Sequence, residues 1–165
     1  MTFEDAYENY HKCIYTYIYS MVGTRDETDD MVQETFIKLY NHLSSHSPLE
    51  NTKTWLYRVA SNTCINYLKR KKIFQKILIL NNPEERHKHR NPQEEEVIKE
   101  QERMLVRNAL EKLPARDRAI LMLYRDKLSY SDIAAVLNIK ASSIGKILSR
   151  AREKLAGEIR KGEKK

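Results

Sequence analysis

The sequence predicts an all-α protein made of two small helical domains joined by a flexible linker, the C-terminal one a helix-turn-helix. The 165 residues include only four Gly and four Pro, which leaves little room for hairpin turns. No stretch alternates apolar and polar residues with the period of two that marks a strand. A polar stretch without periodicity, residues 81–96, separates two regions of helical periodicity and predicts the linker.

Helical periodicity divides the N-terminal half into three expected helices. Apolar and aromatic side chains recur at helical spacing over residues 3–22, from about residue 29 to 43, and from about residue 52 to 72. Residues 24–28 are expected to form a polar break, and residues 44–48 a loop that ends in Pro48. The apolar run Ile77–Leu80 either extends the third helix or packs against a partner.

The C-terminal half begins with an expected helix over residues 97–112, and Pro114 opens the next one. A helix-turn-helix follows, with a first helix at residues 129–137 and a longer second one at residues 141–155. Ser129 or Ser131 can cap the first of these helices, and Asn138 tolerates a left-handed turn between them. Gly145 costs the second helix about 1 kcal/mol relative to Ala, which indicates close approach of its backbone to DNA or to the neighbouring helix.

The second helix of this motif has two different faces. At 100° per residue, an apolar face opposes a polar one that carries Ser142, Ser143, Lys146, Ser149 and Arg150. Short hydroxyls and long cations on an exposed helix, supported by another helix behind it, fit the major groove of DNA. The helix-turn-helix therefore predicts DNA binding.

The charge distribution predicts more than one DNA contact. The net charge is +7, but residues 1–50 carry three basic and nine acidic side chains, a balance of −6. Residues 51–72 carry six basic and no acidic side chains, and residues 101–165 carry sixteen basic and eight acidic ones. DNA attracts both basic regions but not the acidic one, so we expect two DNA contacts and a separate protein contact.

Two further helix surfaces fit these roles. The expected second helix has an outward polar face with Asp30, Gln33, Glu34, Lys38 and Asn41. On the expected third helix, an aromatic side chain, two amides and two cations lie within roughly 80° of one another: Trp55, Arg58, Asn62, Asn66 and Lys69. Such a stripe suits stacking on bases and contacts to phosphates, although Trp55 would equally suit a core position.

The sequence favours no catalytic or cofactor chemistry. It contains no phosphate-cradling Gly loop, no nucleophile elbow and no zinc-ligand spacing around His87 and His89, so we expect neither an enzyme nor a metal or cofactor site. Cys13 and Cys64 are expected to be reduced core thiols. The absence of a signal-peptide pattern and of a long apolar run predicts a cytoplasmic protein.

Three motifs in order resemble the sigma-70 family of bacterial transcription initiation factors, in its smallest form, the extracytoplasmic-function (ECF) group. Residues 30–40, Asp-Met-Val-Gln-Glu-Thr-Phe-Ile-Lys-Leu-Tyr, resemble the core-binding helix of the family's region 2. Residues 54–63, Thr-Trp-Leu-Tyr-Arg-Val-Ala-Ser-Asn-Thr, with 66–68, Asn-Tyr-Leu, resemble its promoter-melting helix. Leu113-Pro114, residues 129–134 (Ser-Tyr-Ser-Asp-Ile-Ala) and residues 149–155 (Ser-Arg-Ala-Arg-Glu-Lys-Leu) resemble region 4.

The resemblance implies a region 2 domain at residues 1–73, a linker at 74–100 and a region 4 domain at 101–161. Asp30, Gln33, Glu34 and Lys38 would bind core RNA polymerase at the clamp of its largest subunit. The −10 promoter element would contact Lys53 and the stripe of Trp55, Arg58, Asn62, Asn66 and Lys69. The −35 element would contact the polar face with Ser142, Ser143, Lys146, Ser149 and Arg150, while region 4 meets the flap of the second-largest subunit.

The resemblance also implies regulation. An ECF sigma factor serves a stress or envelope-response regulon and is commonly held by an anti-sigma factor, often membrane-bound. The recognition helix has Ile-Gly-Lys-Ile-Leu at residues 144–148 where the family often has Thr-Val-Lys-Ser-Arg, so family −35 preferences do not carry over.

Two other functions compete with this one. An autonomous helix-turn-helix regulator, which acts without polymerase, would need a dimer interface and an effector pocket, so its mass in size-exclusion chromatography discriminates it. A protein-interaction adaptor with basic solubilising faces would keep its activity after Lys146→Ala or Arg150→Ala.

Overall fold

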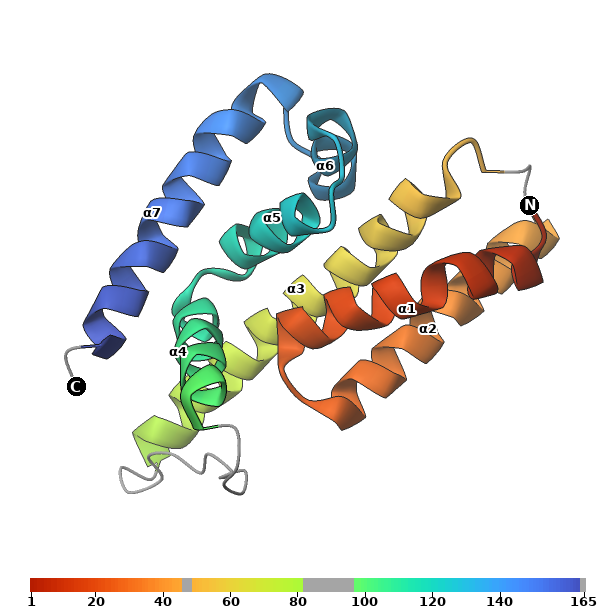
Figure 1. Ribbon diagram of the computed structural model, residues 1–165. Coiled ribbons are helices and arrows are strands. Elements are labelled where there is room, and N and C mark those ends of the chain that lie inside the picture. The colour runs from red at the N-terminus through yellow and green to blue at the C-terminus, as the bar shows by residue number, and fades with distance from the viewer. Residues whose placement is uncertain (46–48, 82–96, 164–165) are drawn as a thin grey trace.

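Every regular element is helical in the part of the chain that the computed structural model describes, residues 1–45, 49–81 and 97–163 (Figure 1). Side chains are described for residues 1–45, 49–77 and 103–163. The N-terminal lobe consists of α1 (Phe3–Val22), α2 (Arg25–Ser45) and α3 (Thr52–Asn81). The C-terminal lobe consists of α4 (Val97–Lys112), α5 (Ala115–Arg125), α6 (Tyr130–Leu137), a 3-10 turn (Ala141–Ser143) and α7 (Ile144–Glu163). This confirms the all-α fold class.

The first turns of the N-terminal lobe show why its second helix starts earlier than expected. Thr2 and Asp5 form a capping box at the start of α1, and Gly23, with φ of 82°, ends that helix in the left-handed region. The Thr24 side chain then hydrogen-bonds that of Glu27, and α2 begins at Arg25. The expected break at residues 24–28 was therefore wrong, because its polar residues are the first turn of a helix, where acidic side chains are favourable.

Two other helices are longer than the periodicity predicted. The third extends past Lys72 to Asn81, so Ile77–Leu80 continues the helix. Beyond Lys72, α3 carries three exposed apolar side chains: Ile73 (59% exposed), Phe74 (62%) and Ile77 (50%). The recognition helix starts with the 3-10 turn and runs to Glu163, where it packs against α4.

The two lobes share one hydrophobic core. Ile14, Ile18, Leu39, Leu56 and Ala60 are fully buried in the N-terminal lobe. Their counterparts in the C-terminal lobe are Ile120, Leu123, Ile133, Leu148 and Ala151, and the whole set belongs to a single cluster.

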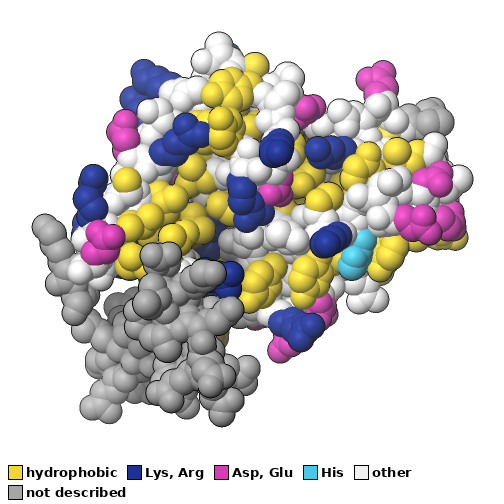
Figure 2. Space-filling model, viewed as in Figure 1, with side chains coloured by type: hydrophobic (Ala, Val, Ile, Leu, Met, Phe, Trp, Pro, Cys, Tyr) yellow, Lys and Arg dark blue, Asp and Glu magenta, His cyan; other side chains and the backbone are white. Residues whose placement is uncertain are grey.

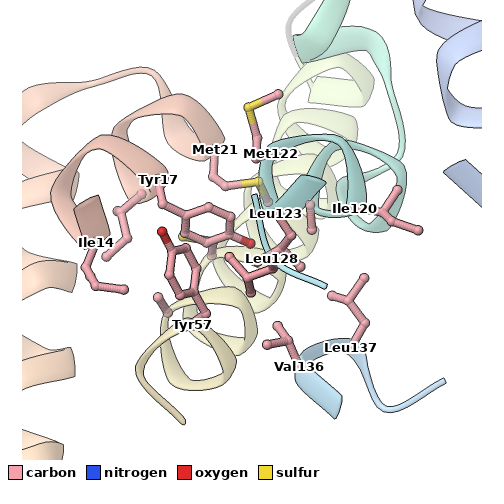
Figure 3. Close-up of a cluster of buried hydrophobic side chains, with 14 of the residues drawn as sticks. Ile14, Tyr17, Met21, Tyr57, Ile120, Met122, Leu123, Leu128, Val136 and Leu137 are labelled. Atoms are coloured by element: carbon pink, nitrogen blue, oxygen red, sulfur yellow. The ribbon is translucent and has the colours of Figure 1, made fainter. Parts of the chain in front are cut away.

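Aromatic and sulfur side chains join the two halves of this core. Tyr17 on α1 and Tyr57 on α3 cross edge to face, with ring centroids 5.2 Å apart. They lie beside Met21, Leu123 and Leu128, where α1 and α3 meet α5 (Figure 3). The lobes therefore pack directly against each other, which the expectation of two linked domains did not foresee.

Candidate nucleic-acid and protein interfaces

The predicted protein-binding face forms a ridge along α2. Asp30, Gln33, Glu34 and Lys38 are all exposed, and Glu34 and Lys38 form an i,i+4 ion pair of 2.5 Å. At these exposures the pair contributes little to stability, so its charges remain available to a partner. In Figure 2, acidic side chains gather at the end of the molecule where α1 begins.

An apolar groove borders this ridge on the side of α1. Its volume is about 600 Å³, and aromatic side chains from both helices line it. Phe36 is buried at its base, with the ring of Tyr7 at 4.9 Å, while Ile37 and Tyr40 stay exposed at its edge.

A polar groove of about 500 Å³ borders the ridge on the other side, between α2 and α3. It brings Asp30, Glu34 and Lys38 of the predicted protein-binding face together with Asn62 and Asn66 of the predicted DNA stripe. The two predicted surfaces are therefore neighbours.

Tyr67 and Glu27 connect the two helices across this groove. The Tyr67 hydroxyl donates to the Glu27 carboxylate at 3.1 Å. Hydrogen bonds, first from Thr24 and then from Tyr67, lower the pKa of Glu27. Burial, reinforced by the Glu27 carboxylate, raises the pKa of Tyr67 to about 12. The groove walls are thus held by a carboxylate and a neutral phenol at physiological pH.

The predicted −10 stripe on α3 is exposed at its C-terminal end and contacts the other lobe near its N-terminal end, where Arg58 is exposed and Trp55 half-buried. Asn62, Asn66 and Lys69 are exposed. Trp55 is half-buried, with its ring 5.2 Å from that of His42, so it is neither a full core residue nor an open platform. Arg58 points to the other lobe, where its Nε donates to the carbonyl oxygen of Ala135 on α6 at 3.1 Å.

Lys53, the remaining predicted −10 residue, is half-buried at the start of the same helix. Its charge helps to lower the pKa of Asp132 on α6, behind larger effects from Ser129 and Thr54. The N-terminal end of the predicted DNA stripe therefore faces the helix-turn-helix.

The helix-turn-helix has the predicted local geometry. Ser129 caps α6 by accepting from the Asp132 backbone at 3.1 Å, and Asn138 adopts the left-handed region with φ of 52°. Of the predicted −35 residues, Ser142, Lys146, Ser149 and Arg150 are exposed and Ser143 is half-buried. Since α7 packs on α4, α5 and α6, this face points away from the other lobe.

Gly145 has room for a side chain. A Cβ built there would meet the Tyr130 ring at 3.8 Å, an ordinary van der Waals contact. Close packing against the neighbouring helix, one of the two expected reasons for this glycine, is therefore not what the structure shows.

Sequence reasoning missed the polar contacts between the lobes. Thr54 Oγ1 donates to Asp132 Oδ1 at 2.9 Å, and the Tyr57 hydroxyl donates to Asp126 Oδ2 at 3.1 Å. These partners lie 78 and 69 residues apart in the chain, so no local pattern reveals them. Burial and the Asp126 charge raise the pKa of Tyr57, which keeps it a hydroxyl donor.

Arg118 on α5 is the most buried charged group of this interface, with 5% of its surface exposed. Its Nη1 donates to the Met21 carbonyl at 2.5 Å, and its Nη2 to the Glu111 carbonyl at 2.8 Å. Both acceptors lie in the last turn of a helix, where the dipole favours a cation. The residues Ala119–Leu123 are all apolar, and all are buried. A helix that is apolar all round is covered on every side, so this run was the one sequence signal that another lobe packs on α5.

No cluster of three or more metal-ligating side chains occurs among the described residues. His87 and His89 lie outside them. No helix in the described part of the chain is long and apolar enough to span a bilayer. Cys64 is buried and Cys13 half-buried, and both are free thiols, as expected.

The fold is that of a helical protein with a C-terminal helix-turn-helix, and comparisons with known proteins specify its family. Sigma-70 region 2 matches residues 6–73, and Sigma-70, region 4 matches residues 103–155. The ECF RNA polymerase sigma factor SigM of Bacillus subtilis is 27% identical over 98% of each chain. The ECF RNA polymerase sigma-E factor of Salmonella typhimurium is 31% identical, over 81% of this chain and 74% of that protein.

Solved structures share the fold across both lobes. The sigma factor RpoE of Bartonella quintana, solved with the anti-sigma factor NepR, matches with a TM-score of 0.70 and 21% identity over 96% of each chain. CnrH, solved with the cytosolic domain of CnrY, matches with a TM-score of 0.66 and 20% identity over 94% of this chain and 85% of that one. The chain belongs to the sigma-70 family of RNA polymerase sigma factors, in its ECF group. It therefore acts in promoter-specific initiation of transcription by RNA polymerase.

Proposed function

We propose that three surfaces of this sigma factor have separate roles in initiation. The α2 ridge (Asp30, Gln33, Glu34 and Lys38) binds the clamp of core polymerase, the α3 stripe with Lys53 binds the −10 element, and the polar face of α7 binds the −35 element. The observation that carries this assignment is the polar groove between α2 and α3, which has the ridge on one wall and Asn62 and Asn66 on the other. A strand held at that groove would lie against the polymerase clamp.

The chemistry of each surface supports its role. The ridge offers carboxylates and an amide to a basic partner, and it lies in the acidic part of the chain. Exposed amides and a cation on the stripe can hydrogen-bond unpaired base edges and contact phosphate. The polar face of α7 combines hydroxyls with two long cations, as major-groove binding requires. In this arrangement region 4 also meets the flap of the second-largest subunit.

Charge reversal tests the ridge. Asp30→Lys is expected to reduce co-purification with core polymerase by more than tenfold, because a cation would then face the basic clamp. Glu8→Lys is the matched control, since Glu8 is an exposed acid on α1 outside the ridge. Equal loss in both variants would show that only net charge matters and would contradict the assignment.

Template design tests the two DNA surfaces. Asn62→Ala with Asn66→Ala is expected to lower initiation on duplex promoters more than on templates with a pre-melted −10 element. Lys146→Ala and Arg150→Ala should lower initiation most on promoters that depend strongly on the −35 element. Where a base contact is lost, each variant should weaken binding to that element by about 1–3 kcal/mol. The exposed Arg160→Ala serves as the control for lost positive charge on α7.

We also propose that an anti-sigma factor binds this chain. RpoE and CnrH, which share its fold, were solved with NepR and the cytosolic domain of CnrY. Purification of the tagged chain from its native cells, with and without stress, would identify such a partner. The proposal requires that the partner prevents assembly with core polymerase.

A further inference from the structure

The C-terminal end of α3 carries an apolar strip that no other described element covers. Its members, Ile73, Phe74 and Ile77, are each at least half exposed. All of residues 72–77 are exposed, so this length of the helix has no buried side. Single apolar side chains in water are common in proteins, but a contiguous exposed set marks an interaction site. The strip therefore calls for a partner outside the fold.

The same end of α3 is strongly basic. Five of the eight residues 69–76 are Lys or Arg, and residues 51–77 contain no acidic side chain. At 100° per residue, the three apolar side chains lie within about 100° of one another. The other side of the helix carries Lys71, Lys72, Gln75 and Lys76. Lys71 and Lys76 thus border the strip on its two sides, and the partner has to satisfy both apolar and cationic groups.

Neither DNA nor a second protein fits this combination well. Phosphates attract the cations but leave the apolar strip in water. A stable protein interface buries about 800 Å² on each partner, far more than three side chains on less than two helical turns provide. A second copy of the chain would bring two sets of cations together, which costs free energy.

We propose that the C-terminal end of α3 binds the surface of a membrane that contains anionic lipids. The three apolar side chains enter the boundary between headgroups and acyl chains, and the cations beside them contact headgroup phosphates. Lysine suits these flanking positions, because its stem lies along the apolar strip while its ammonium stays in water. This binding is separate from the promoter and polymerase contacts proposed above.

Flotation with lipid vesicles tests the apolar strip. The wild type should float with vesicles of equal parts phosphatidylglycerol and phosphatidylcholine, and at least tenfold less with phosphatidylcholine alone. Ile73→Ser with Phe74→Ser and Ile77→Ser should weaken binding to the anionic vesicles at least tenfold. Val106→Ser is the matched control, because Val106 is an exposed apolar residue on α4, and this variant should bind as the wild type does. Unchanged binding of the triple variant would overturn the proposal.

A second pair of variants separates this site from general attraction by the net charge of +7. Lys72→Gln with Lys76→Gln removes two exposed cations beside the strip and should weaken vesicle binding at least fivefold. Arg160→Gln with Lys161→Gln removes two exposed cations from α7 and should have little effect. Equal losses in the two double variants would show adsorption by net charge, and the proposed site would then be wrong.

Tryptophan fluorescence tests whether the strip leaves water. The emission that Phe74→Trp adds to that of the wild type should shift to shorter wavelength when anionic vesicles are added, and an unshifted spectrum would contradict insertion.

Run-off transcription with core polymerase, in the absence of lipid, identifies a competing occupant. The triple serine variant keeps Lys69 of the −10 stripe, so it should initiate like the wild type. A variant that loses initiation but still floats with anionic vesicles would assign the strip to the polymerase and exclude the membrane.

Discussion

Arg118 offers the sharpest test of how the lobes are held together. Arg118→Ala removes a buried guanidinium that bridges the last turns of α1 and α4 from its position on α5. It leaves the carbonyl oxygens of Met21 and Glu111 without this donor. Arg118→Lys keeps the charge but replaces a two-pronged donor by one ammonium, which cannot reproduce both contacts.

The expected magnitude comes from those two hydrogen bonds. Hydrogen bonds to charged groups contribute about 1.5–3 kcal/mol each, and part of this is offset because the guanidinium is no longer desolvated. Burial lowers the pKa of Arg118, because removing the guanidinium from water disfavours its charged form. The direction of this pKa shift agrees with a desolvation cost. The free energy of unfolding should fall by about 3–5 kcal/mol in Arg118→Ala and by about half of that in Arg118→Lys.

Urea unfolding followed by circular dichroism measures this loss. The matched control is Arg116→Ala, an exposed arginine on the same helix, which should change stability by less than about 0.5 kcal/mol. Because Arg118 connects the lobes, its loss should also split a single transition into two. A decrease below about 1 kcal/mol, with one transition preserved, would refute the role assigned to Arg118.

Three other perturbations probe separate features. Gly145→Ala should raise the free energy of unfolding in urea by about 1 kcal/mol, because a Cβ fits at this position. If DNA approaches the backbone at Gly145, the same variant should also initiate less from −35-dependent promoters. A variant that gains both stability and activity would exclude such an approach. Iodoacetamide at pH 8 should leave Cys64 unmodified in the native protein, because burial raises the pKa of its thiol to about 12, and mass spectrometry that finds it alkylated would contradict this. Hydrogen bonds from Ser129 in its own lobe and from Thr54 across the interface lower the pKa of Asp132. Only the part due to Thr54 favours the packed lobes, and this part is present above about pH 4 and lost as pH falls through the lowered value. Scattering between pH 7 and pH 3 should show acid opening that Asp132→Asn reduces, and an identical profile in that variant would exclude Asp132 as a cause.

Local patterns in the sequence were sufficient for the existence of the helices and for the caps of the helix-turn-helix. The Ser129 cap, the left-handed Asn138 and the polar face of α7 depend on neighbours within one or two turns, so periodicity and capping rules predict them. Helix ends were less accurate. Thr24 and Glu27 resembled a loop because capping residues and loop residues are the same polar types.

The packing of the lobes could not be predicted from the sequence. Thr54 and Tyr57 lie on the side of α3 between its core face and its polar stripe, and Arg58 lies at the adjacent edge of that stripe. Whether such residues meet solvent, DNA or another lobe depends on partners some 70 residues away, and no periodicity encodes these. The roles assigned to the ridge, the stripe and the recognition face stay predictions until the variants above are measured.

Run-off transcription with core polymerase over genomic fragments, with start-site mapping, tests the central claim most directly. A promoter-specificity subunit should create new start sites only when chain and core are combined, and should bind duplex promoter DNA weakly alone. Tight binding to an operator without polymerase, together with no new start site in its presence, would contradict the account.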